Sequence, residues 1–307
     1  MGRAEAPLFD MSTPSPDQPG MGNWLLIIGL GIIWGSAFMA IALSLDGYSP
    51  LWTAALRVAF GAVAVLLWAE ATGQSVRHLY QVPKAWAFAG AIGMMTATIP
   101  MVLLTWGLQF VPSAFAGIAM GTVPLLILPL AYLFSPEEGI GPRRIIGIAL
   151  GFFGLVLLVG TGAFEGGTLS AQLACILAAS CYAIGSITTR RAPKMPPLAF
   201  AGATLLVGAG LLIPLAAFVE GPPQLAPIQP TLALIYLGLL PTGLAAVMRV
   251  RVITTAGSVF MSQTSYMVPL WATFFGVVLL GESLPAQTFL SLALILAGIA
   301  ISQSRKR

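Results

Sequence analysis

One basic side chain stands inside an apolar segment, and it is the residue of this sequence with the clearest chemical potential. Arg57 lies within the apolar run 50–72. A guanidinium binds a carboxylate through two parallel hydrogen bonds, whereas an unpaired charge in an apolar span is unfavourable. Arg57 is therefore a candidate to attract the carboxylate of a solute. The alternative is a structural role, in which it pairs with carbonyls at a helix end or with an acidic residue.

Polar and aromatic residues near the middle of other apolar runs extend this candidate site. Several recur four residues apart, as Trp34 and Phe38 do, which places them on one face of a helix. The full set is Trp34, Phe38, Arg57, Thr96, Pro100, Tyr182, Ser186, Gln263, Tyr266 and Trp271. Such a wall suits zwitterionic or cationic metabolites with apolar side chains, because aromatic faces attract cations. The alternatives are helix packing for the aromatic residues and bonds to the i−4 carbonyl for the hydroxyls.

Four of the prolines inside the apolar runs are candidate hinges, namely Pro100, Pro124, Pro241 and Pro269. Each removes a backbone hydrogen bond and bends its helix. The bends can serve as flex points for gating, or they can be static kinks.

Ten apolar runs position these residues and predict an all-α integral membrane protein. Of 307 residues, 58% are hydrophobic and 8% are charged, whereas a soluble domain carries about 25% charged residues. The runs are 23–45, 50–72, 85–108, 113–134, 144–160, 169–189, 198–219, 230–248, 257–280 and 285–303. Each is near the roughly 20 residues that a helix needs to cross a bilayer.

The basic residues predict the orientation of these spans. Thirteen of the fourteen Lys and Arg residues lie in every second gap or in the tails. They are Arg3, Arg77, Lys84, Arg143, Arg144, Arg190, Arg191, Lys194, Arg249, Arg251, Arg305, Lys306 and Arg307. The opposite gaps hold Asp46, Glu165, Glu220 and Glu282. Because Lys and Arg near span ends stay in the cytoplasm, both termini are predicted to be cytoplasmic, with 1–22 as a disordered tail. The basic pI then reflects topology and anionic lipid, and we expect no nucleic-acid partner.

The sequence carries no catalytic or metal-binding motif that we recognise. Walker A, HExxH and GxSxG patterns are absent, and the sole histidine, His78, falls in a predicted cytoplasmic turn. Cys175 and Cys181 are six residues apart, about 9 Å along a helix, so we expect buried thiols without a disulfide. We expect no enzyme activity, no metal and no cofactor.

The chain also repeats itself at an offset of 145 residues. Ser113, Phe115, Val123, Pro124, Leu125 and Glu137 match Ser258, Phe260, Val268, Pro269, Leu270 and Glu282. Five spans separate the copies, so the second copy is inverted in the bilayer. Inverted repeats form two similar halves around a site near the midplane. The alternative is that two apolar helix pairs resemble each other only through their low complexity, although apolar composition does not explain the matching Pro and Glu residues.

In this order, the motifs resemble those of the drug/metabolite transporter (DMT) superfamily, in its ten-helix EamA-type branch. The motifs are Ile33-Trp34-Gly35-Ser36, Ser49-Pro50-Leu51 with Arg57, Val123-Pro124, Glu137, the glycines Gly147, Gly151 and Gly154, then Cys181-Tyr182-Ala183, Val268-Pro269 and Gly281-Glu282. The resemblance implies two inverted five-helix repeats, 23–160 and 169–303, around a central cavity. The second repeat departs from the pattern, because it lacks a counterpart of Arg57 and has a basic turn at Arg249 and Arg251.

The resemblance also implies a secondary transporter that exports amino acids or related metabolites across the inner membrane by alternating access. Multidrug or quaternary-cation efflux is one alternative, and a channel or structural membrane subunit is another. An intramembrane enzyme would need clustered nucleophiles or carboxylates at one depth, and the apolar runs show no such cluster. No Asp or Glu lies at mid-depth, so we predict facilitated transport without strict proton coupling. Gly147, Gly151 and Gly154 form a glycine face that we expect to pack against Ala293 and Ala297 of the tenth span, with a homodimer contact as the alternative. Besides membrane lipid and the solute, we therefore expect no partner and a monomer.

Overall fold

The protein is a bundle of membrane-spanning helices, as the apolar runs predict. The computed structural model describes residues 20–134, 141–160, 168–224 and 226–303. Within these ranges, nine helical stretches are long and apolar enough to cross a membrane, and the shorter apolar helix α12 is the tenth. The predicted tail 1–22 lies almost entirely outside the described residues, as do Glu137 and Glu165.

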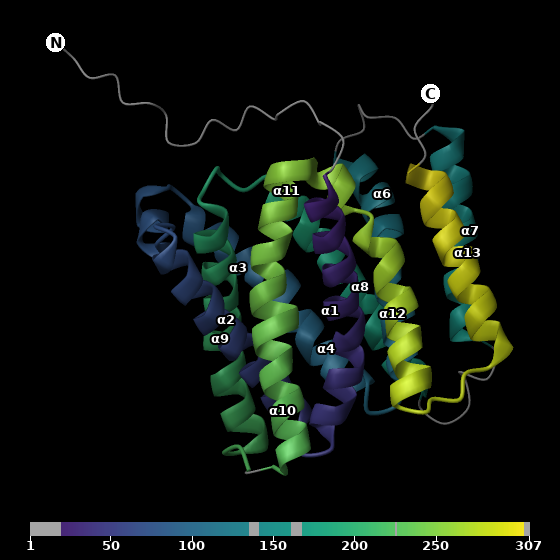
Figure 1. Ribbon diagram of the computed structural model, residues 1–307, viewed down its shortest axis with the longest axis horizontal. Coiled ribbons are helices and arrows are strands. Elements are labelled where there is room, and N and C mark those ends of the chain that lie inside the picture. The colour runs from purple at the N-terminus through teal and green to yellow at the C-terminus, as the bar shows by residue number, and fades with distance from the viewer. Residues whose placement is uncertain (1–19, 135–140, 161–167, 225, 304–307) are drawn as a thin grey trace.

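Several spans consist of more than one helical segment (Figure 1). The segments are α1 (Met21–Leu45), α2 (Pro50–Ala71), η1 (Val76–Gln81), α3 (Ala85–Gly93), η2 (Met94–Thr98), α4 (Ile99–Gly107), α5 (Ser113–Gly121), α6 (Val123–Phe134), α7 (Pro142–Val159), α8 (Thr168–Arg190), α9 (Pro197–Glu220), α10 (Ile228–Leu237), η5 (Gly238–Leu244), α11 (Ala245–Met261), α12 (Thr264–Leu279) and α13 (Ala286–Gln303). The third span is α3-η2-α4, the fourth α5-α6 and the eighth α10-η5-α11.

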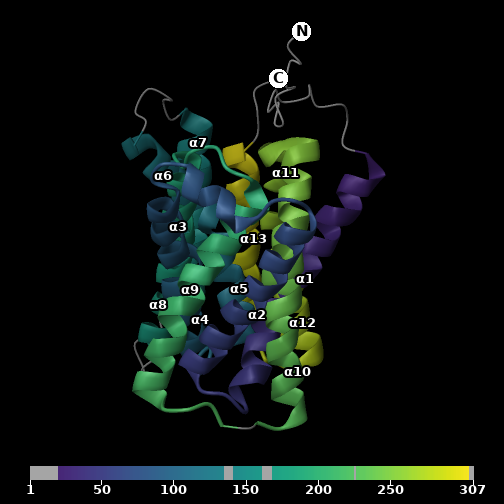
Figure 2. The same cartoon turned by 90° about the vertical axis from the view of Figure 1, so that its left-hand side faces the viewer.

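The path of the chain agrees with an even number of crossings in two inverted repeats. The start of α1 and the end of α13 lie at one end of the molecule (Figure 1). The end of α6 and the start of α7 lie at that same end (Figure 2). The turn that contains Gly281 and Glu282 lies at the opposite end (Figure 1). The two repeat-related turns therefore flank opposite faces, as an inverted repeat requires.

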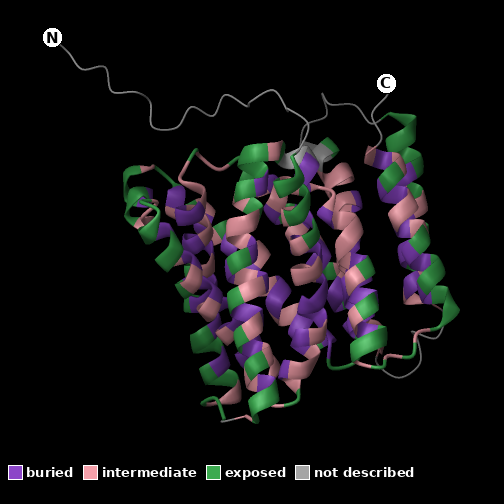
Figure 3. Cartoon of the chain, in the orientation of Figure 1, coloured by how far each residue is buried: buried purple, intermediate pink, exposed green. Residues whose placement is uncertain are grey.

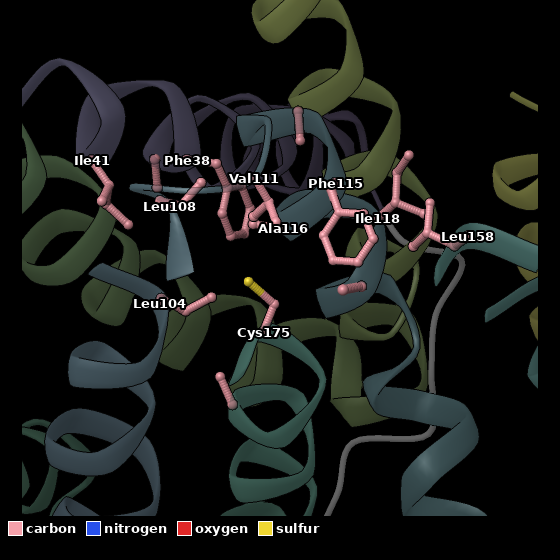
Figure 4. Close-up of a cluster of buried hydrophobic side chains, with 14 of the residues drawn as sticks. Phe38, Ile41, Leu104, Leu108, Val111, Phe115, Ala116, Ile118, Leu158 and Cys175 are labelled. Atoms are coloured by element: carbon pink, nitrogen blue, oxygen red, sulfur yellow. The ribbon is translucent and has the colours of Figure 1, made fainter. Parts of the chain in front are cut away.

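The outside of the bundle is apolar and its centre is tightly packed. Exposed residues lie mainly on the periphery (Figure 3). Large apolar side chains are exposed there, among them Phe153, Phe218 and Val278. In water such a surface would be unfavourable, whereas lipid solvates it. The largest internal cluster of apolar side chains joins both repeats, because Phe38 and Phe115 share it with Cys175 (Figure 4).

Glycines let the fifth and tenth spans approach backbone to backbone. A Cβ on Gly147 would lie 2.6 Å from the carbonyl oxygen of Gly298, and one on Gly154 would lie 2.9 Å from Cβ of Leu294. The predicted packing of the glycine face against the tenth helix is therefore present. On α13, however, the small residue at the contact is Gly298, while Ala293 is exposed. Small residues at such contacts are what close helix pairs in membranes require.

Two glutamates bind the first backbone N–H groups of helices from other parts of the chain. Glu220, at the end of α9, accepts hydrogen bonds from the backbone N–H groups of Leu51 and Trp52 at the start of α2, each at 3.1 Å. Glu282 accepts from the N–H groups of Ser113 and Ala114 at the start of α5. A carboxylate at a helix N-terminus satisfies donors that have no partner within the helix, and it interacts favourably with the helix dipole.

Candidate substrate-binding site

Arg57 lies at the contact between the two repeats. Its side chain is buried, with 7% of its surface exposed. Nε donates a hydrogen bond of 3.1 Å to the hydroxyl oxygen of Thr242, in the π-helical segment η5. Arg57 is about 10 Å from the N-terminal end of α2 at 1.5 Å per residue, and Glu220 binds that end itself. The partner of Arg57 is thus a hydroxyl of the other repeat, which sequence reasoning did not identify.

A proline fixes the orientation of this hydroxyl. Pro241 has no N–H to donate to the Leu237 carbonyl four residues earlier, and the π-helical pattern of η5 pairs this carbonyl instead with the backbone N–H of Thr242. Thr242 donates its hydroxyl hydrogen to that carbonyl, at 2.9 Å. Because the hydroxyl has only one hydrogen, its lone pairs face Arg57 and accept from Nε. A bend in the helix therefore creates a buried acceptor for a buried cation.

The eighth span is longer than the sequence predicted, and this changes the position of Arg249. The predicted span ended at residue 248, with Arg249 and Arg251 in a basic turn. Instead the helix continues to Gly257, whose φ of +84° interrupts it. No Gly or Pro stands between Ala245 and Ala256 to end the helix earlier. The expectations that Arg57 is the only basic residue inside a span, and that Arg249 lies in a turn, are both wrong.

Arg249 and Arg57 both lie within electrostatic range of Tyr182, on α8. The side chain of Arg249 is exposed, whereas that of Arg57 is buried and that of Tyr182 is half-buried. The described residues thus bring two cations and a phenol, from α2, α8 and α11, into one region between the repeats.

Trp34 borders the same region through the bent helix. Its indole Nε1–H donates to the carbonyl oxygen of Pro241 at 3.1 Å, which gives this mid-depth tryptophan the partner that a buried N–H requires. Nearby on α1, the hydroxyl of Ser36 bonds to that of Tyr236 on α10. Sequence reasoning missed Tyr236, because a single tyrosine in an apolar run is indistinguishable from one at a lipid interface.

The candidate hydroxyls of the third and sixth spans are bonded within their own helices. Thr96 donates to the Ile92 carbonyl at 2.8 Å, and Ser186 donates to the Tyr182 carbonyl at 2.9 Å. The side chain of Thr96 packs against Gly185, where a Cβ would lie 2.5 Å from its methyl group. These bonds match the i−4 alternative and leave lone pairs of the oxygens as acceptors.

Four further candidates lie elsewhere. Phe38 is buried in the cluster of Figure 4, beside Phe115. Tyr266 donates its hydroxyl hydrogen to the Gln303 side chain at 3.2 Å, near the end of α13, and Gln263 precedes the same helix α12. Trp271 stacks on Phe275, with centroids 5.8 Å apart. The structure does not bring these side chains to Arg57, and their binding role stays a prediction.

Two of the four candidate hinge prolines coincide with π-helical turns. Pro100 follows η2 directly, and Pro241 lies within η5. Such turns recur at functional sites and leave backbone groups outside the regular pattern. Pro269 packs instead against Gly121, where a Cβ would lie 2.5 Å from its ring, and Pro124 is the second residue of α6. Gating at these prolines stays a prediction.

Comparisons with known proteins agree with this architecture. A model of the EamA-like transporter family matches the chain twice, over residues 22–160 and 169–303. One solved crystal structure is 24% identical, with a TM-score of 0.68 over 92% of this chain and 97% of that one. At this identity the likeness shows the fold alone.

Curated relatives are similar over nearly the whole chain. The chain is 27% identical over 280 residues to YedA, an uncharacterized inner membrane transporter of Escherichia coli K12. The aligned region covers 90% of this chain and 88% of that protein. The chain is 28% identical over 282 residues to a probable terminal-alkyne amino-acid exporter of Streptantibioticus cattleyicolor, with 92% and 93% covered.

Proposed function

Because the chain belongs to the EamA-like transporter family, we propose that it exports amino acids or related small metabolites across the cytoplasmic membrane by alternating access. Membrane transport is the activity of this family, and one similar protein is named as an amino-acid exporter. Export direction and substrate are our inference from these relatives. A transporter family also agrees with the expectation that the chain is not an enzyme.

The bond between Arg57 and Thr242 is the observation that carries this proposal. It joins the first repeat to the second between α2 and the bent eighth span. A solute bound there would contact elements of both repeats, so it can shift the equilibrium between two arrangements by its difference in affinity for them.

We further propose that transport is facilitated and that the protein acts as a monomer. The acidic residues of the described spans, Glu70 and Glu220, lie in terminal turns. A carrier driven by protons usually has a titratable group at mid-depth. Uptake that strictly required a pH gradient would contradict the facilitated mechanism, and a dimer in detergent-free nanodiscs would contradict the monomer.

Counterflow in proteoliposomes tests the function. Vesicles with purified protein, preloaded with an unlabelled amino-acid mixture, should accumulate labelled solute transiently and with saturation. A channel would give uptake without counterflow. Rapid flux without counterflow would therefore refute the carrier mechanism.

The distribution of Lys and Arg supports cytoplasmic termini in the inner membrane. Single cysteines at two exposed turn positions test this orientation. Asp46→Cys should react with an impermeant maleimide from outside intact spheroplasts, and Gln81→Cys only after lysis. The native Cys175 and Cys181 are buried, so the unchanged protein is the control. The reverse labelling pattern would invert the proposed topology.

A further inference from the structure

We propose that this region between the repeats binds a solute of net negative charge, held by Arg57 and Arg249 near Tyr182. The inference rests on the proposed function and specifies the substrate class for the same site. It favours acidic amino acids, dicarboxylates and organophosphates over neutral zwitterions and quaternary cations.

The first step is the position of the two guanidinium groups. Thr242, which binds Arg57, and Arg249 are seven residues apart on one continuous helix. Seven residues are about two turns and about 10 Å, so both lie on roughly the same side of it. Tyr182, on the separate helix α8, lies within electrostatic range of both arginines, which supports the convergence that the helical spacing indicates.

The second step is the charge that surrounds them. The carboxylates of the described residues are Asp46, Glu70, Glu220 and Glu282, and all lie in turns or at helix ends. Glu220 and Glu282 are bound to helix N-termini, and Glu70 accepts a hydrogen bond from Ser75. Arg57 and Arg249 thus have no carboxylate from these residues beside them. For the buried Arg57, a charge without compensation is unfavourable, and a bound anion would compensate it.

The third step is the number of donors. A guanidinium carries five N–H donors, and Thr242 accepts from only the Nε donor of Arg57. The two terminal nitrogens present the fork that fits carboxylate and phosphate oxygens. The accessible Arg249 presents a second fork. A zwitterion carries no net charge, because its ammonium cancels its carboxylate, so it cannot offset the positive charges of the two arginines. A quaternary cation is repelled by both arginines.

Counterflow and binding with a fixed panel of solutes test the inference. The panel is glutamate, succinate, glycerol 3-phosphate, leucine and tetraethylammonium, at clamped membrane potential and equal ionic strength. We expect counterflow of one or more of the three anions. Arg249→Gln should raise the KM for that anion at least about 10-fold, the effect of one lost charge-assisted hydrogen bond. Arg251→Gln is the matched control and should change it less than about 3-fold, because Arg251, two residues further on, lies about 200° around α11 from Arg249 and so on its other side.

A binding measurement separates this inference from the proposed function. Succinate or glycerol 3-phosphate should raise the thermal unfolding temperature of the purified protein in detergent, whereas sodium chloride of the same ionic strength should not. The rise should disappear in Arg249→Gln. Stabilisation without counterflow would refute transport and retain the anion site. Counterflow of leucine or tetraethylammonium with a KM that Arg249→Gln leaves unchanged would overturn the anion site and retain transport. A comparison of glutamate and succinate with glycerol 3-phosphate shows whether the site takes a carboxylate or a phosphate.

Discussion

Replacing Thr242 by valine should destabilise the protein more than the same change at an exposed threonine. The hydroxyl of Thr242 accepts from the buried Arg57 and donates to the Leu237 carbonyl. Valine has nearly the same shape but neither polar function. A hydrogen bond to a charged group contributes about 1.5–3 kcal/mol. The Leu237 carbonyl keeps a donor in the variant, because the π-helical pattern of η5 pairs it with the backbone N–H of residue 242. We therefore expect Thr242→Val to lower the free energy of unfolding by about 1.5–3 kcal/mol.

Equilibrium unfolding in mixed SDS and dodecylmaltoside micelles, followed by tryptophan fluorescence, measures this loss. Thr254→Val is the matched control, because Thr254 lies in the same span, is exposed, and donates only to carbonyls of its own helix. Its loss should be below about 1 kcal/mol. Thr242→Ser keeps both bonds and should recover most of the stability. Equal losses for Thr242→Val and Thr254→Val would refute the argument that the Thr242 hydroxyl stabilises a buried cation.

Three other substitutions have definite expected outcomes. Glu282→Gln should lower the unfolding free energy by about 2–4 kcal/mol, because it removes a charge that binds two N–H groups and faces a helix dipole; exposed Glu70→Gln, measured in the same micelles, should cost less than about 1 kcal/mol. Gly147→Ala should cost about 1–3 kcal/mol, because its Cβ would meet the α13 backbone, whereas Gly90→Ala, with open space around it, should be neutral or stabilising; equal melting temperatures would contradict this. Pro241→Ala restores an N–H to η5 and should lower the maximal counterflow rate more than it changes KM; an unchanged rate would leave the bend without a role in gating.

Most of the fold could be predicted from the sequence, because the bilayer imposes a simple rule. Every backbone group within lipid must be bonded inside the chain, so an apolar run of sufficient length is a helix. The number of crossings and the inversion of the repeats follow from that rule and from the offset of 145 residues. The family match over residues 22–160 and 169–303 is consistent with the same division.

The rule failed where a charged residue does not mark the end of a helix. Arg249 and Arg251 were expected in a turn, because Lys and Arg usually flank spans. A basic residue near the end of a span does not by itself end a helix, however, and no Gly or Pro interrupts α11 before Gly257. The helix therefore continues past Arg249 and Arg251. Charge alone cannot distinguish a helix that ends at the membrane boundary from one that continues past its basic residues.

Hydrogen-bond partners between helices were the other part that sequence could not provide. Trp34 and Arg57 were identifiable, because an indole or a guanidinium in a span must bond to something. Their partners, the Pro241 carbonyl and Thr242, became acceptors through the bend of a helix in the other repeat. A proline in the sequence shows that a carbonyl is freed, but not which side chain from elsewhere reaches the bend.

These contacts make the bent eighth span the element on which a bound anion would act. Arg57 is bonded to Thr242 through Nε in the conformation described here, and its two terminal nitrogens form the fork that an anion would take. A solute moves a two-state equilibrium only by its difference in affinity for the two states. Because the Nε bond holds the guanidinium at the bend, an arrangement that moves the eighth span away from α2 would also move this fork away from Arg249. A bound anion would therefore favour the arrangement in which the bond from Arg57 to Thr242 is made.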